Sequence, residues 1–218
     1  MRSRNAASFL RAGALLIAAM TAAQGAILDR IAVTVGRQVI TESDVDRDLR
    51  VAAFLDRKPI DLSGEQKRKA ADRLVDQLLI LQEAAFSRVP LPDRADAEKL
   101  IEPVKKEYGD DYSAALKRYR ITQNDVVEQL FAGVRALRYT DLRFRPEVQY
   151  SDADLRQLYS TLVDEGKKKG EQQIPGFEAS REQLEKLLTD QKTEQALDRW
   201  LQNQRTETPI LYRDEVFK

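Results

Sequence analysis

The sequence predicts a mainly α protein, in which several helices pack around a small β-sheet built from an N-terminal hairpin and a C-terminal strand. Three observations favour this fold class. Charged residues make up 33% of the chain, whereas it contains only nine glycines and seven prolines. Several long segments repeat apolar residues at the three- and four-residue spacing of a helix that faces a core. Strand-like alternation is confined to two short segments near the ends of the chain.

The first strand-like segment predicts a hairpin over residues 31–40. Ile31, Val33 and Val35 alternate with smaller residues, and Gly36-Arg37 separates them from the apolar pair Val39-Ile40. A two-residue loop with glycine first fits a type II′ turn. Because an isolated hairpin is marginal in water, a third strand is needed. Ile210-Leu211-Tyr212 is the candidate for it, and Trp200 is expected to pack beneath the resulting sheet.

The segment TESDVDRDL follows the hairpin and places three aspartates at alternate positions, as a calcium-binding loop does. An EF-hand loop that begins at Asp44 needs glycine at its sixth position and glutamate at its twelfth, and this chain has Leu49 and Leu55 there. No metal site is therefore expected. Thr41 and Ser43 are suitable N-caps, and acidic residues in a first turn complement the helix dipole, so a helix is predicted from Ser43 to Leu55.

Further helices follow from apolar periodicity and from proline and cap signals. Pro103 is expected to kink or divide the third of them. Thr122 with Asp125, and Ser151, mark the beginnings of two later helices. The polar, glycine-containing segment 165–177 is predicted to be a flexible loop. The predicted helices are 65–88, 93–107, a short one ending at Tyr119, one from Thr122 to about Arg145, one from Ser151 through Leu162, and 178–204.

Residues 1–26 have the features of a secretory signal peptide. Three arginines precede the apolar run AGALLIAAM, and small residues surround an expected cleavage site near Gly25 or Ala26. The predicted location is the periplasm, without stable membrane insertion after cleavage, and a retained N-terminal anchor is the alternative. Cleavage would leave 33 basic and 36 acidic residues, a net charge of about −3, so no nucleic-acid partner is expected.

The residue content excludes several kinds of active site. The chain has neither histidine nor cysteine, which removes disulfides, the common zinc sites and the nucleophile systems that use these residues. No Walker loop, GxGxxG or SxxK motif is present, so no cofactor is expected. An enzyme that uses carboxylates alone stays an alternative, but with 36 acidic residues a pair of them carries little information. We expect a protein that is not an enzyme.

Four segments in order resemble the SurA-type periplasmic chaperones. IAVTVGRQVITESDVDRDL resembles the family's opening hairpin and helix, and QLLILQEAAFSR its long leucine-rich helix. ITQNDVVEQLFAGVRALR is similar to a later long helix, and LDRWLQNQR with the terminal strand to the C-terminal segment. Family members carry parvulin prolyl isomerase domains before the final helix, and those centres use histidines. The resemblance therefore implies a chaperone core over 27–218 (hairpin and helices 27–164, loop 165–177, helix and strand 178–218) without a parvulin domain.

Such a core implies an ATP-independent holdase that binds unfolded outer-membrane or exported polypeptides in an apolar helical cleft. Aromatic side chains are the candidate contacts, although core packing is the simpler explanation for any one of them. The rival interpretation is a non-catalytic assembly subunit that uses its long helices as an interface, for example in a homodimer. The candidate binding residues are Phe54, Tyr108, Tyr112, Tyr119, Phe131, Tyr139 and Phe144.

Overall fold

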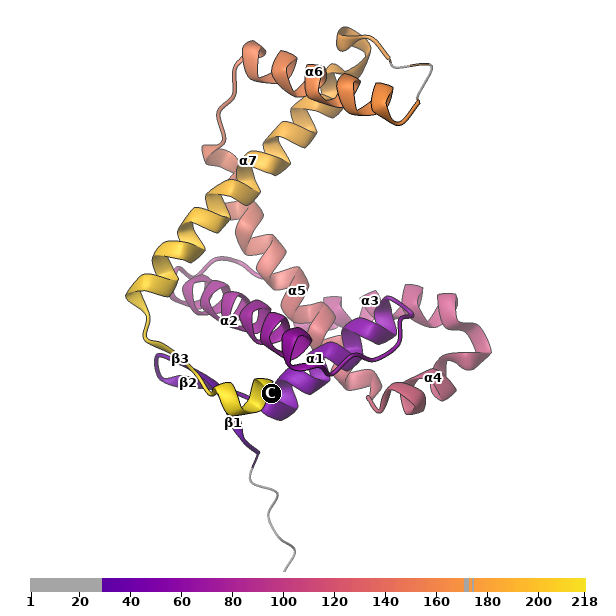
Figure 1. Ribbon diagram of the computed structural model, residues 1–218, viewed down its shortest axis with the longest axis vertical. Helices are drawn as coiled ribbons and strands as arrows, with labels where there is room; N and C mark the ends of the chain where they lie inside the picture. The colour runs from indigo at the N-terminus through magenta and orange to yellow at the C-terminus, as the bar shows by residue number, and fades with distance from the viewer. Residues whose placement is uncertain (1–28, 171–172, 174) are drawn as a thin grey trace, which may run out of the picture.

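The computed structural model describes residues 29–170, 173 and 175–218 (Figure 1). Helices dominate these residues, and strands from the two ends of the described chain form a small antiparallel sheet. The predicted fold class is therefore confirmed. The signal peptide predicted at 1–26 lies outside the described residues. None of the helices within the described ranges combines the length and the hydropathy that a membrane crossing requires.

The sheet has the strand order β2-β1-β3, so the terminal strand pairs with the hairpin as expected. β1 (Ile31–Val35) lies between β2 (Gln38–Thr41) and β3 (Ile210–Tyr212), antiparallel to both. Gly36 has a φ of +57° in the turn, and Arg37 does not have a positive φ, in agreement with a type II′ turn. Glycine is needed there because a Cβ disfavours this conformation.

Helix α1 (Glu42–Leu55) begins where the sequence predicts. The hydroxyl of Thr41 accepts from the backbone N–H of Asp44, whose carboxylate accepts from the Thr41 backbone in return. The other two aspartates of the segment pair with basic residues of helix α2 (Gly64–Phe86). Asp46 lies 3.1 Å from the Lys67 ammonium, and Asp48 lies 2.7 Å from the Arg73 guanidinium. The alternating aspartates thus have separate structural partners.

Helices α3 (Arg94–Tyr108), α4 (Tyr112–Tyr119) and α5 (Gln123–Arg143) follow. Thr122 and Asp125 form a second capping box at the start of α5, as predicted. Pro103 was expected to kink or divide the third helix, and a division is wrong, because α3 is continuous through it. Proline removes the hydrogen bond to the carbonyl four residues earlier, which belongs to Lys99, an exposed residue.

Helix α6 (Asp152–Lys168) and the long helix α7 (Phe177–Glu207) form the C-terminal part. The prediction of a flexible loop from residue 165 is wrong at its start, because α6 continues to Lys168 with Gly166 buried in it. The predicted cap at Ser151 agrees with the start of α6, and the predicted helix 178–204 agrees closely with α7. Packing of α6 on α7 through Leu155, Leu184 and Leu188 overrides the polar, glycine-containing composition.

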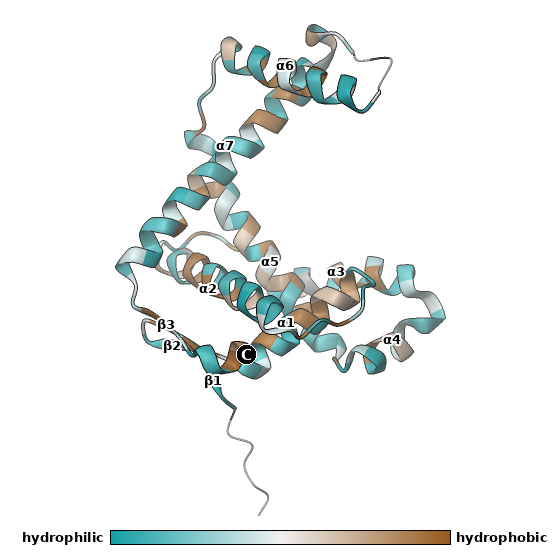
Figure 2. Cartoon of the chain, viewed as in Figure 1, coloured by the Kyte–Doolittle hydropathy of each residue, from teal (hydrophilic) through white to brown (hydrophobic). Residues whose placement is uncertain are grey.

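The helices form a body and an arm (Figure 1). The body contains the sheet and α1–α5, whereas the arm, α6 with the N-terminal part of α7, extends away from it. Hydrophobic residues are concentrated in the body along the strands, α1, α2 and α3, and α6 is largely hydrophilic on its outside (Figure 2). The C-terminal part of α7 returns to the body, where Trp200 packs against both the core beneath the sheet and the core around Tyr139.

Candidate functional site

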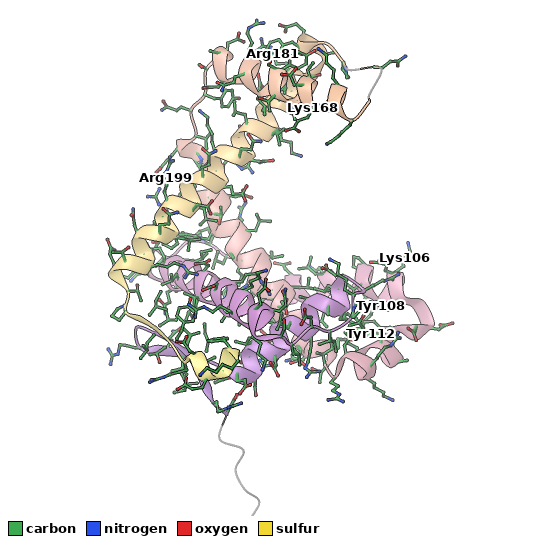
Figure 3. All side chains as sticks on the ribbon, viewed as in Figure 1. Lys106, Tyr108, Tyr112, Lys168, Arg181 and Arg199 are labelled. Atoms are coloured by element: carbon green, nitrogen blue, oxygen red, sulfur yellow. The ribbon has the colours of Figure 1, made fainter. Side chains whose placement is uncertain are left out.

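Four of the seven candidate aromatic residues form one cluster between α1, α3 and α4. The rings of Phe54 and Tyr108 are stacked with centroids 4.5 Å apart, and Tyr112 and Tyr119 meet Phe54 edge-on at 6.1 and 5.7 Å. Figure 3 shows Tyr108 and Tyr112 close together at the end of the body that lies away from the sheet. The cluster joins the α3–α4 pair to α1.

Two hydroxyl groups of this cluster, those of Tyr108 and Tyr119, donate hydrogen bonds to backbone carbonyls. Tyr108 donates to the carbonyl of Phe54 at 2.5 Å, and Tyr119 donates to the carbonyl of Lys58 at 3.0 Å. Burial raises the pKa of Tyr108 and of Tyr112, so both phenols stay neutral donors at ordinary pH. Bonds of this kind hold the end of α1 and its following loop in place, which is a structural role.

The other three aromatic residues lie elsewhere. Tyr139 and Phe144 are buried, and their rings lie 6.2 and 6.0 Å from that of Trp200 on α7. Phe131 is partly buried against the first cluster, with the Arg135 guanidinium 5.2 Å above its ring. The seven aromatic residues thus do not converge on one open cleft. Their role in binding stays a prediction, and packing accounts for their present positions.

An open apolar groove lies instead where α5 crosses α1 and α2. We call it the helix groove. It is a hollow of about 400 Å³ with Leu137, 62% exposed, at its mouth. The periodicity of α5 identifies Leu130, Val134 and Leu137 as one stripe, but it does not distinguish the part of a stripe that is covered from the part that is not. The groove is lined by Asp48, Leu55, Arg73, Leu74, Gln77, Gln129, Leu130, Gly133, Val134 and Leu137.

A second hollow lies nearer the N-terminal end of α5, next to β2. We call it the edge hollow; its volume is about 270 Å³. Asp48, Leu74, Gln77 and Gln129 line both hollows, so the two are adjacent. The remaining lining residues of the edge hollow are Val39, Ile40, Asp44, Arg47, Leu78, Leu81, Asp125, Glu128 and Ala132.

The polar residues of the two hollows are paired in a way that leaves the apolar surface accessible. The side chain of Asp48, 12% exposed, bonds to Arg73, and burial raises the Asp48 pKa although the guanidinium opposes this. Arg47 lies 3.2 Å from Asp44 and 3.6 Å from Asp125. These pairs form a polar rim around leucine side chains, which suits the binding of an apolar segment better than a chemical reaction.

The described residues offer no other chemistry at this site. They contain no group of three acidic side chains positioned to hold a metal ion. The arm has a hollow of about 310 Å³ between α6 and α7, with Leu162 and Leu187 exposed at its edge.

Comparison of the chain with protein-family models and with curated protein sequences found no match. The case for a function therefore rests on the residues and their arrangement.

Proposed function

We propose that this protein is an ATP-independent periplasmic holdase, which binds unfolded outer-membrane or other exported polypeptides in the helix groove. The observation that carries the proposal is the apolar groove with Leu137 largely exposed at its mouth. The resemblance of four segments to SurA-type chaperones and the signal-peptide pattern of residues 1–26 point in the same direction.

The size of the groove suits weak and reversible binding. Covering Leu137 with a client side chain contributes about 1–2 kcal/mol, since full burial of a leucine contributes about 1.5–3 kcal/mol. A few such contacts support micromolar affinity after the costs of ordering the client. Affinity of this order allows a client to be shielded from aggregation and then released without a nucleotide.

Suppression of aggregation tests the proposal. An outer-membrane protein diluted from urea is expected to scatter less light when near-stoichiometric protein is present without nucleotide. Leu137→Lys should reduce this protection several-fold, because a charge replaces the apolar contact. The matched control is Leu142→Lys, which changes a 37% exposed leucine of the same helix outside the groove. Scattering that rises equally with and without the protein would contradict the proposal.

Prolyl isomerase activity is not part of the proposal. The chain has no histidine, and the resemblance implies a core without the parvulin domain. A proline-containing peptide should isomerise at the same rate with the native protein as with a heat-treated sample. Catalysed conversion well above that control would contradict this part of the proposal.

The rival proposal is an assembly subunit that uses its long helices as an interface. The exposure of Leu162 and Leu187 on the arm favours it, because these leucines and the hollow beside them would suit a second helix. Light scattering across protein concentration, with and without an unfolded client, separates the two. A stable dimer that does not bind client would favour the assembly role.

A further inference from the structure

Among the described residues, no strand pairs with the outer edge of β2, so backbone groups there are available for another strand. Gly36 N–H donates to Pro209 O at 2.8 Å, and Arg213 N–H donates to Ala32 O at 2.9 Å, so the even-numbered residues of the central strand bond to β3. Val33 and Val35 of this strand consequently bond to β2, and the register shifts between Ile31 and Val33. Val39 is opposite Thr34, an even-numbered residue, and therefore directs its N–H and C=O away from the sheet.

The edge hollow lies beside this free edge. Val39 itself lines the hollow and is 50% exposed, with Leu78 and Leu81 of α2 forming apolar walls. The next outward-facing donor, the N–H of Thr41, is already bonded to Asp44 at 3.0 Å. One backbone position with an adjacent apolar pocket is thus available to an extended chain. This is the arrangement used in β-augmentation, where main-chain bonds supply affinity and pockets supply selectivity.

The charges at the hollow indicate what kind of chain fits. Four carboxylates line it, those of Asp44, Asp48, Asp125 and Glu128, with Arg47 as the one guanidinium among its lining residues. Glu128 is about half exposed, and its partner Arg94 reaches it from outside the hollow. An apolar segment flanked by lysine or arginine complements this rim, whereas an acidic flank opposes it.

We propose that the edge of β2 and the edge hollow bind an extended, apolar polypeptide segment with basic flanks as an additional strand of the sheet. This proposal rests on the holdase function and specifies the conformation and the class of client segment. A second copy of the chain is the less suitable occupant. Pairing centred on Val39 of a four-residue strand falls well short of the roughly 1,000 Å² that a stable interface buries, but it suits transient capture.

Binding of short labelled peptides to the full chain tests the proposal by fluorescence anisotropy. The probe is a valine-threonine repeat flanked by lysines, compared with the same repeat flanked by glutamates. The lysine-flanked peptide should bind about tenfold more tightly at low salt, and the difference should shrink as salt is added. N-methylation of alternate residues should weaken binding by about tenfold in one of the two alternate series and leave the other series unchanged, because only alternate amides face the edge.

Protein variants locate the site. Val39→Pro removes the edge N–H and should abolish the difference between the two N-methyl series, while Val39→Thr retains it. Glu128→Lys should weaken the preference for lysine flanks, because it removes one of the four carboxylates and adds a cation, while Glu185→Lys on the arm should leave the preference unchanged. If Val39→Pro fails to fold, the comparison of the two N-methyl series with the wild-type chain still tests whether the peptide binds as an additional strand.

Three results would overturn the proposal: equal tolerance of N-methylation in both series, no preference between flanks, or a dimer in solution that Val39→Pro dissociates. A different result would contradict the underlying holdase function. That result is aggregation of the outer-membrane protein that the chain does not suppress, whether or not the peptides show the expected pattern. Protection that survives in Val39→Pro while Leu137→Lys abolishes it would keep the holdase function and reject the strand-addition site.

Discussion

Arg205 connects the end of α7 to α2 and to the terminal strand, and its removal is the most informative test of how the fold closes. Its Nε lies 2.7 Å from Asp76 Oδ1, one Nη donates to the carbonyl of Asp72 at 2.9 Å, and the other lies 3.3 Å from the Tyr212 hydroxyl. Tyr212 in turn donates to Asp72 Oδ1 at 2.5 Å. The carboxylate of Asp76 raises the pKa of Arg205, so its charge is retained throughout the accessible pH range.

The expected cost of Arg205→Ala follows from these bonds. A hydrogen bond to a charged group contributes about 1.5–3 kcal/mol when buried. The Arg205 side chain is 29% exposed, so about 1 kcal/mol for each of the three bonds is appropriate, and the variant should lose about 2–3 kcal/mol of the free energy of unfolding. With a urea m-value of about 2 kcal/mol/M, the midpoint should fall by about 1 M.

Urea unfolding monitored by the fluorescence of Trp200, the one tryptophan of the chain, measures this loss. Arg199→Ala is the matched control, because Arg199 lies on the same helix but is exposed (Figure 3). A double-mutant cycle with Asp76→Asn isolates the pair term. A midpoint for Arg205→Ala within about 0.2 M of that of Arg199→Ala would show that the Arg205 bonds do not stabilise the fold.

Three further predictions concern the same body. Truncation after Arg205 removes β3 and the buried Val216, so the urea midpoint should fall with fluorescence and helix signal moving together; an unchanged midpoint would show that the terminal strand is dispensable. Gly64→Ala should destabilise the fold, because the added Cβ would lie 1.9 Å from the Phe217 carbonyl oxygen. At Gly133 an added Cβ has open space, so Gly133→Ala should stabilise the fold by up to about 1 kcal/mol. Urea midpoints of the two variants measure both effects. Asp48→Asn should gain stability relative to the wild type as pH rises from about 4 to 7. The reason is that the Asp48 pKa is raised in the folded state, so ionisation of this carboxyl opposes folding. A urea midpoint of Asp48→Asn that falls relative to the wild type over that interval would contradict this.

Local signals account for most of what the sequence predicted correctly. Helix starts at Thr41, Thr122 and Ser151 follow from side chains that bond to backbone groups three residues away, an interaction that needs no tertiary context. The pairing of Ile210–Tyr212 with the hairpin was predicted because a two-stranded hairpin is too small to be stable alone.

What the sequence did not predict depends on packing between distant segments. Helix α6 extends to Lys168 because α7 covers it, and nothing in the local composition of that segment indicates such a cover. The sequence also does not predict which apolar side chains are exposed. Phe54 and Leu137 both belong to apolar helix stripes, yet Phe54 is buried and Leu137 is largely exposed. Periodicity identifies the apolar face of a helix but not which part of that face lacks a partner.

Site-specific photo-crosslinking tests whether unfolded clients bind in the helix groove. A photoreactive phenylalanine analogue is placed at the position of Leu137, in the mouth of the helix groove, or at that of Leu142 on the same helix outside it. Each protein is irradiated with an unfolded outer-membrane protein and, separately, with the same protein folded in detergent. We expect strong crosslinks from position 137 to the unfolded client only, and weak ones from position 142. Equal crosslinking from both positions, or none to the unfolded client, would contradict a client-binding groove at this site.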